Sequence, residues 1–177
     1  MYETLLGESW YTLHPAIRTF HEPSARVRRA GGKFRIHAAA SIAARGVARL
    51  ARMPPPADTV DVSVVVTTEP SGECWRRKFG AWPLESVQRI AGDLVAERFG
   101  AIEVRFRLEA ADGALWYRFA GAALRLGILA LPLPLLATAS ERAVGDSAIA
   151  VSVDVAMKAI GRIVAYEGTL TRIEVER

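Results

Sequence analysis

The sequence contains a single cysteine, Cys74, and this scarcity excludes two kinds of structure. One thiol cannot form a disulfide within the chain, and it cannot supply a cysteine-based metal site. A chain without internal disulfides is typical of a reducing compartment, so we expect a cytoplasmic protein. Lysine is almost as rare, at Lys33, Lys78 and Lys158. Arginine therefore carries most of the positive charge, which indicates a compositional bias more than a function.

The sequence also has little that could cross a membrane. Segment 119–139 is almost entirely apolar and is long enough for a spanning helix. It is interrupted by Arg125, Pro132 and Pro134, which would leave a charge and backbone groups unsatisfied in lipid. Residues 1–12 lack the basic start and apolar run of a signal peptide. We therefore expect no membrane span.

Motifs for common cofactors and polymers are missing as well. The chain has no Gly-x-Gly-x-x-Gly or other phosphate-cradling loop, no His-Glu-x-x-His and no nucleic-acid motif. The net charge is only +4, and charges of both signs are mixed along the chain. The densest basic cluster, Arg26, Arg28 and Arg29, is interpreted as solvated charge. These observations predict no metal, no cofactor and no nucleic-acid partner.

What the sequence does contain is globular and rich in alternating patterns. With 177 residues, 51% hydrophobic and 24% charged, it predicts one domain over residues 1–177. Helical spacing of apolar residues occurs at 2–21, with a second piece beginning at Pro15, and again at 40–52. Strand patterns occur at 25–38 (with a Gly31-Gly32 turn), 60–67, 73–79, 84–91, 102–109, 115–119, 149–155 and 162–175.

Consecutive strands with short turns predict an α+β fold with an antiparallel sheet. We expect about seven or eight strands, curved into a half-barrel to barrel-like shape, with two N-terminal helices packed at its open side. The strongest local pattern is at 101–121, where two alternating arms flank Asp112-Gly113 and predict a β-hairpin. Residues 93–99 are ambiguous, and 122–140 is interpreted as a Leu-Pro-rich connection.

One short segment suggests a site. On a strand at 73–79, Glu73, Trp75, Arg77 and Phe79 share one face. An arginine between two large aromatics needs a partner or a stacking ring if it is buried. The two charges are about 13 Å apart at ~3.3 Å per residue, so they cannot pair with each other.

Two interpretations of this face stay open. Arg77 could be structural, bonded to a carboxylate of a neighbouring strand, or it could hold an anionic ligand in a bidentate grip. Glu73 could act as a general base if burial raises its pKa. The possible partners for the two charges are Glu97, Glu167, Tyr117 and Arg105.

A second cluster is His14, Arg18 and His21, which would share one face of a helix. Such a face could bind an anion or supply an acid–base pair near neutral pH. It could equally be a polar helix surface, with His21 capping the helix end. The spacing does not match a metal site.

Several short motifs together resemble a bacterial family, domain-of-unknown-function family 4166. They are Leu6-Gly7, Leu13-His14-Pro15, Arg18-x-x-His21, Trp75-x-Arg77-x-Phe79 with Ser86, Glu97-x-x-Gly100, Leu131-Pro132-Leu133-Pro134 and Tyr166-x-Gly168. The resemblance implies no activity. Its members are similar to domains fused behind dinucleotide-binding modules, but this chain has no such module, so no cofactor is implied. Members tend to have Leu-Pro before the arginine, so the inserted His14 receives no role.

Three functions remain compatible with the sequence. The first is binding of a small apolar, amphiphilic or anionic molecule on the concave face of the sheet, by Trp75, Arg77, Phe79, Arg18, Glu97 and Tyr166. The second is a cofactor-independent enzyme for cyclisation, isomerisation or hydration, with catalytic candidates Glu73, His21 and Tyr117. The third is an interaction domain that dimerises through the apolar loop 128–136.

Overall fold

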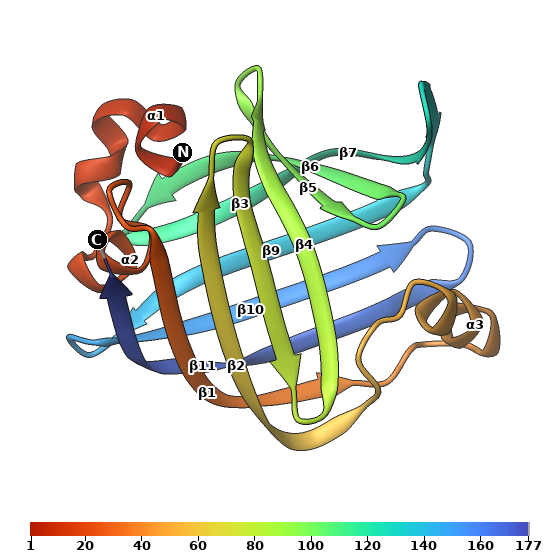
Figure 1. Ribbon diagram of the computed structural model, residues 1–177. Helices are drawn as coiled ribbons and strands as arrows, with labels where there is room; N and C mark the ends of the chain where they lie inside the picture. The colour runs from red at the N-terminus through yellow and green to blue at the C-terminus, as the bar shows by residue number, and fades with distance from the viewer. Residues whose placement is uncertain (177) are drawn as a thin grey trace.

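A closed antiparallel barrel dominates the computed structural model, which describes residues 1–176 (Figure 1). Eleven strands follow the order β6-β5-β4-β3-β2-β1-β11-β10-β9-β7-β8, and β6 also pairs with β7. Ten strands thus form a ring, and β8 lies outside it along the end of β7. The strands are β1 (Val27–His37), β2 (Ala57–Glu69), β3 (Gly72–Phe79), β4 (Trp82–Ala91), β5 (Leu94–Phe99), β6 (Ile102–Ala111), β7 (Ala114–Leu126), β8 (Leu129–Pro132), β9 (Leu135–Val144), β10 (Ala148–Met157) and β11 (Gly161–Glu176).

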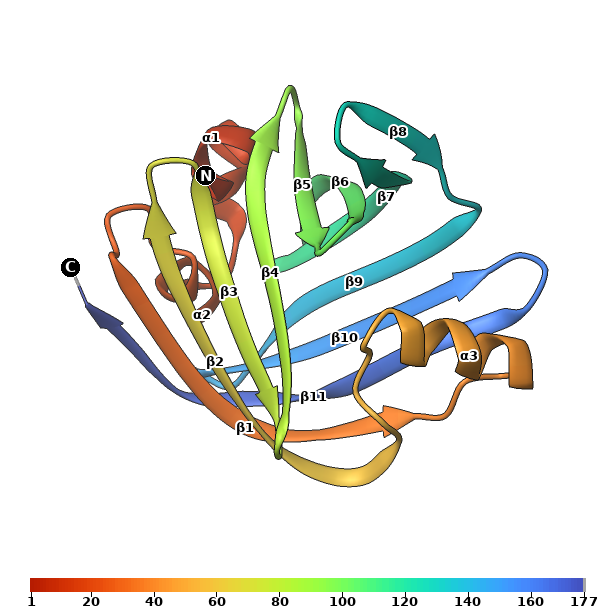
Figure 2. The same ribbon diagram turned by 45° about the vertical axis from the view of Figure 1, so that its right-hand side comes forward.

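The helices lie at the two ends of the barrel. One end is covered by α1 (Tyr2–Leu6), the 3₁₀ helix η1 (Gly7–Thr12) and α2 (Pro15–Phe20), which pack on β6 and on β9–β11. The fourth helix, α3 (Ile42–Leu50), lies at the opposite end (Figure 2). No helix within residues 1–176 is both long enough and apolar enough to cross a bilayer.

We call the two ends the covered end and the mouth. The covered end consists of the segments 1–26, 70–71, 92–93, 112–113 and 145–147. The mouth consists of the segments 38–56, 80–81, 100–101, 127–134 and 158–160.

Alternating side chains fill the barrel interior, as the sequence predicts. Along β3, Glu73, Trp75 and Phe79 are buried, whereas Arg76 and Lys78 are exposed. The predicted hairpin is confirmed: β6 pairs with β7 from Ala111↔Ala114 onward. Asp112 and Gly113 form its turn with φ of 53° and 74°, the left-handed values that such a tight turn requires.

The predicted strand count is too low because three strands escaped the pattern. The ambiguous segment 93–99 forms β5, and the predicted connection 122–140 contains the end of β7, β8 and most of β9. The alanines and prolines of this region have low strand propensity, and its apolar residues show no clear alternation. Pairing with β10 and β7 nevertheless makes β9 a full member of the barrel.

Three further expectations are corrected by the structure. Gly31 and Gly32 form no turn, since β1 runs straight through them with a bulge against β11 after Arg29. The N-terminal helical region has three short pieces rather than two helices. Arg28 is not solvated, because it points into the barrel and is only 1% exposed.

A charge cluster on the outer wall ties β4, β6 and β7 together near the mouth. The carboxylate of Glu103 is 2% exposed and binds Arg89, Arg105 and Arg125 at 2.8–3.0 Å. Burial alone would raise the pKa of Glu103. The three guanidinium hydrogen bonds outweigh that effect and lower its pKa to about 2.

The close contact between β1 and β11 predicts that Gly32 tolerates no side chain. A Cβ there would lie 1.9 Å from the Thr169 carbonyl oxygen, and backbone cannot yield as a side chain does. We expect Gly32→Ala to lower the free energy of unfolding by about 2 kcal/mol or more, measured by urea denaturation. The matched control is Gly46→Ala in α3, where nothing lies within 4 Å. It should stabilise the protein by up to about 1 kcal/mol. Equal losses at both sites would contradict this account.

The Glu103 cluster predicts a loss of stability in acid. Since folding lowers the pKa of Glu103, its contribution is present above the ordinary value of 4.5 and is lost as pH falls towards 2. A lowering of this size corresponds to about 3 kcal/mol. Glu103→Gln should therefore destabilise the protein at pH 7 and converge on the wild type near pH 2. Glu109→Gln, which removes an exposed pair with Arg118, is the control and should have little effect. Parallel pH profiles for wild type and Glu103→Gln would refute the prediction.

Candidate functional site

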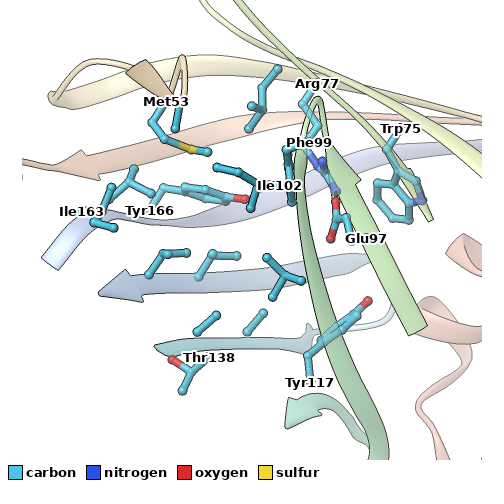
Figure 3. A pocket seen from close by; sticks show the side chains of 18 of the residues that line it. Met53, Trp75, Arg77, Glu97, Phe99, Ile102, Tyr117, Thr138, Ile163 and Tyr166 are labelled. Carbon is cyan, nitrogen blue, oxygen red and sulfur yellow. Dashed lines mark hydrogen bonds and ion pairs between the residues drawn. The ribbon is translucent and has the colours of Figure 1, made fainter. Parts of the chain in front are cut away.

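The barrel encloses a cavity of about 350 Å³ that extends from the mouth towards the covered end (Figure 3). Apolar and aromatic side chains form most of its wall, and they come from nearly every strand of the ring. On the mouth side α3 and the segment after it close over the cavity with Val47, Leu50, Ala51 and Met53. The polar lining is concentrated at the opposite side, which we call the floor: Arg77, Gln88, Glu97, Tyr117 and Glu141.

The first charged pair of the floor joins β3 to β5. Arg77 donates one hydrogen bond to Glu97 Oε1 at 2.9 Å and one to Ser86 Oγ at 2.9 Å. Ser86 in turn donates to Glu97 Oε1 at 2.6 Å. The guanidinium also lies over the ring of Trp75, 4.8 Å from its centroid. Arg77 therefore has a carboxylate partner, as the structural interpretation requires, but the partner comes from β5, across β4, and not from a strand beside β3.

Tyr166 completes this part of the site from β11. Figure 3 shows its hydroxyl directed towards the Arg77–Glu97 pair. Burial raises the pKa of Tyr166, so its hydroxyl keeps its proton at neutral pH. Although burial disfavours the charge of Arg77, the nearby Glu97 carboxylate raises the pKa of Arg77 above its ordinary value. Arg77 is therefore held in its charged form at the floor.

A second polar group reaches the floor from the covered end. His21 Nε2 lies 2.7 Å from Glu141 Oε2, and Tyr117 donates to Glu141 Oε1 at 2.8 Å. The Tyr117 hydroxyl is also 3.3 Å from that of Tyr2, which donates to Gln88 Oε1 at 2.7 Å. These contacts connect α1, α2, β4, β7 and β9 through side chains alone.

The pKa values of Glu141 and Tyr117 are set by burial and by the partners of the two side chains. Burial alone would raise the pKa of Glu141, but the charge of His21 and hydrogen bonds from His21 and Tyr117 lower it. Burial, with the Glu141 charge, raises the pKa of Tyr117 well above its ordinary value. Glu141 is therefore an acceptor and Tyr117 a donor at the floor of the cavity.

A third charged pair, Arg28–Glu73, is buried but does not line the cavity. Arg28 of β1 contacts Glu73 Oε1 at 3.0 Å and donates to Thr68 Oγ1 at 3.0 Å. Trp75 Nε1 donates to the other oxygen of Glu73 at 3.2 Å. Glu73 does not line the cavity. With both oxygens engaged, it is poorly placed as a general base for a molecule in the cavity.

The structure brings together only some of the predicted site residues. Trp75, Arg77, Phe79, Glu97, Tyr117 and Tyr166 line the cavity. His14, Arg18 and His21 do not form one site. The His14 ring accepts a hydrogen bond from the Ala16 amide and caps α2, while His21 lies behind Glu141. Neither Arg18 nor His21 lines the cavity.

Of the suggested partners, Glu167 and Arg105 point outward, where they meet His37 and Glu103. The residues that sequence reasoning missed are Tyr2, Arg28, Gln88 and Glu141. Glu141 alternates with buried Leu135 and Ala137 along β9, and that signal was available had the strand been recognised. Residues 1–176 contain no cluster of three or more histidine, cysteine, aspartate or glutamate side chains suited to a metal ion.

The fold and cavity define a closed antiparallel β-barrel with a mainly apolar interior and a charged floor. The chain belongs to the family described as Domain of unknown function (DUF4166), whose model matches residues 13–170. This membership confirms the resemblance noted in the sequence. A search of curated proteins found no match.

One similar solved structure is a protein with unknown function of the DUF3598 family from Nostoc punctiforme. It is 13% identical and superimposes with a TM-score of 0.48. The alignment covers 84% of this chain and 47% of that one, so this chain spans about half the length of its structural neighbour.

The buried pair predicts a large effect of Arg77→Met. Removing the guanidinium leaves the Glu97 side chain, which is about 10% exposed, without its cation. Breaking a buried pair in this way costs about 3–5 kcal/mol, so thermal and urea stability should fall markedly. The double variant Arg77→Met/Glu97→Leu removes both charges and should recover most of the loss. Unchanged stability of the ligand-free Arg77→Met protein would instead mean that the natural partner of Arg77 is a ligand.

Proposed function

We propose that the protein binds a small, mainly apolar molecule inside the barrel, with one polar group at the floor. The observation that carries the proposal is the cavity itself, about 350 Å³ of largely apolar space with polar groups on one side. Ligand sites typically have volumes of about 300–1,000 Å³ and combine apolar walls with a few placed polar groups. A cavity of this size in a core costs stability, and a bound molecule would recover the lost contacts.

The charges of the floor favour a neutral polar group on the ligand. Arg77 is already neutralised by Glu97, and Glu141 already has two partners in His21 and Tyr117. An anionic head group would have to displace Glu97 from Arg77 and leave a carboxylate unpaired. Both side-chain hydrogen bonds to Glu97 use Oε1, which leaves Oε2 as an acceptor for a hydroxyl or amide. An apolar alcohol or amide therefore fits better than a free acid.

A second candidate function is acid–base catalysis on the same molecule. Its support is the line from His21 through Glu141 to Tyr117, which ends at the cavity. Tyr117 keeps its proton and could polarise a carbonyl or donate to a leaving oxygen in an isomerisation or hydration. Glu73 is the least supported of the catalytic candidates because Arg28 and Trp75 occupy its carboxylate.

Two substitutions on β9 test the binding proposal. Ala139 lines the cavity, and Ala139→Phe would fill part of it. Leu136 lies on the same strand, is 46% exposed and does not line the cavity, so Leu136→Phe is the matched control. Titration with a fluorescent long-chain alcohol should give a dissociation constant at least about tenfold higher for Ala139→Phe. The control should change it less than about twofold.

Native mass spectrometry of the purified protein should, in addition, detect a co-purifying apolar molecule that Ala139→Phe excludes. Failure of the wild type to bind any apolar probe, or equal binding by both phenylalanine variants, would reject the cavity as a ligand site. Conversion of the co-purified molecule on incubation, lost in Tyr117→Phe while binding persists, would decide for the enzyme.

A further inference from the structure

The mouth of the barrel exposes an unusual amount of apolar side chain. In the hairpin between β7 and β8, Leu126 is 52%, Ile128 99% and Leu129 59% exposed. On α3, Ile42 is 80% and Leu50 87% exposed. Figures 1 and 2 both place α3 and this hairpin at the end of the barrel opposite α1 and α2. Scattered exposed apolar residues are normal on proteins, but their collection at one end of the molecule marks a contact surface.

The loops and the helix of this end carry positive charge only, and exposed Asp58 lies just beyond them as the second residue of β2. The five mouth segments contain Arg45, Arg49, Arg52 and Lys158 and no aspartate or glutamate. Within residues 1–176, none of these four side chains makes an ion pair or a hydrogen bond. Arg45 and Arg49 are four residues apart on α3 and so project from one side of it, and Arg52 follows in the turn after the helix.

The covered end has the opposite character. Its four short turns contain Asp93, Asp112 and Asp146 and no lysine or arginine. The N-terminal segment 1–26 adds three glutamates against two arginines. The basic surplus of the mouth is therefore a property of that end, and the general arginine content of the chain does not account for it.

We propose that the mouth docks on an anionic lipid surface. Ile128 and Leu129 of the hairpin and Leu50 of α3 would enter the boundary between head groups and acyl chains, and the four cations would contact the lipid phosphates. An apolar face bordered by basic residues is the pattern of proteins that lie on anionic membranes. Since Leu50 also lines the cavity, this contact would place the cavity entrance at the hydrocarbon of the membrane.

The charge pattern selects lipid over a second copy of the chain. Two mouths facing each other would bring eight unpaired cations together with no acidic residue of the mouth segments to balance them. Repulsion of like charges disfavours that dimer, whereas an anionic bilayer neutralises every cation. The membrane proposal goes beyond the proposed binding function and does not depend on it, because docking needs no occupied cavity.

Vesicle co-sedimentation tests the proposal with the intact protein. Vesicles of phosphatidylcholine with about 30% phosphatidylglycerol should bind the wild type, because an anionic surface attracts basic residues that lie near it. Pure phosphatidylcholine should bind it at least about tenfold more weakly. Raising the salt from about 0.1 M to 0.5 M should release most of the protein.

Two kinds of variant separate the charge from the apolar contact. Arg45→Glu/Arg49→Glu should weaken binding at least about tenfold, with Arg26→Glu at the covered end as control. Ile128→Ser should weaken binding to a similar degree, with Val144→Ser as its control, since Val144 is exposed at the covered end. Circular dichroism and retained binding of the alcohol probe would show that each variant is folded.

Several results would overturn the proposal. They are equal binding to neutral and anionic vesicles, no binding to either, or equal effects of the mouth variants and their controls. Sedimentation equilibrium could give a further contradicting result. If the wild type is a dimer that does not bind vesicles, and Ile128→Ser converts it to a monomer, the mouth is the interface with a second copy of the chain. Vesicle binding without any binding of apolar probes would leave this proposal standing and reject only the ligand function.

Discussion

The pairing of β6 with β7 is the interaction on which the rest of the structure depends. It joins the two ends of a long antiparallel sheet, so that no strand of the ring keeps a free edge, and it creates an interior shielded from bulk water by the barrel wall. The polar side chains that point inward then depend mainly on partners within the protein, although Arg28 Nε and Nη1 and His21 Nδ1 have none. The pairs Arg28–Glu73, Arg77–Glu97 and His21–Glu141 follow from this closure.

These pairs divide the interior into two unequal parts. Next to the covered end, charged and hydroxylic side chains hold one another in place through contacts between strands and helices. Towards the mouth, the wall is apolar, and α3 lies over it as a single short helix packed through small residues such as Ala44 and Ala48. The floor is consequently the more rigid part, because each of its side chains is fixed by several partners. The entrance depends on weaker contacts and is the part able to open.

The features that could be predicted are those that depend on residues close to one another in the sequence. Strict alternation located the hairpin at 101–121 and the inward face of Glu73, Trp75, Arg77 and Phe79. It missed β9, because Leu-Pro-rich chain acquires strand structure here only by pairing with β7 and β10. Contacts between residues far apart in the sequence could not be predicted either. His21 and Glu141, which are in contact, are 120 residues apart. Nothing in the run Arg26, Arg28, Arg29 shows that only its middle member turns inward.

The turns and helices of the two ends differ in charge, so the mouth is the more basic of the two. A free molecule near any charged surface experiences a torque as well as an attraction. In salt of about 0.15 M the field of such a surface decays over about 8 Å. The torque therefore acts only in the last moments of an encounter, when it turns the basic end towards negative charge. Rotation of a small protein is fast, so most encounters would already be correctly oriented when the two surfaces touch.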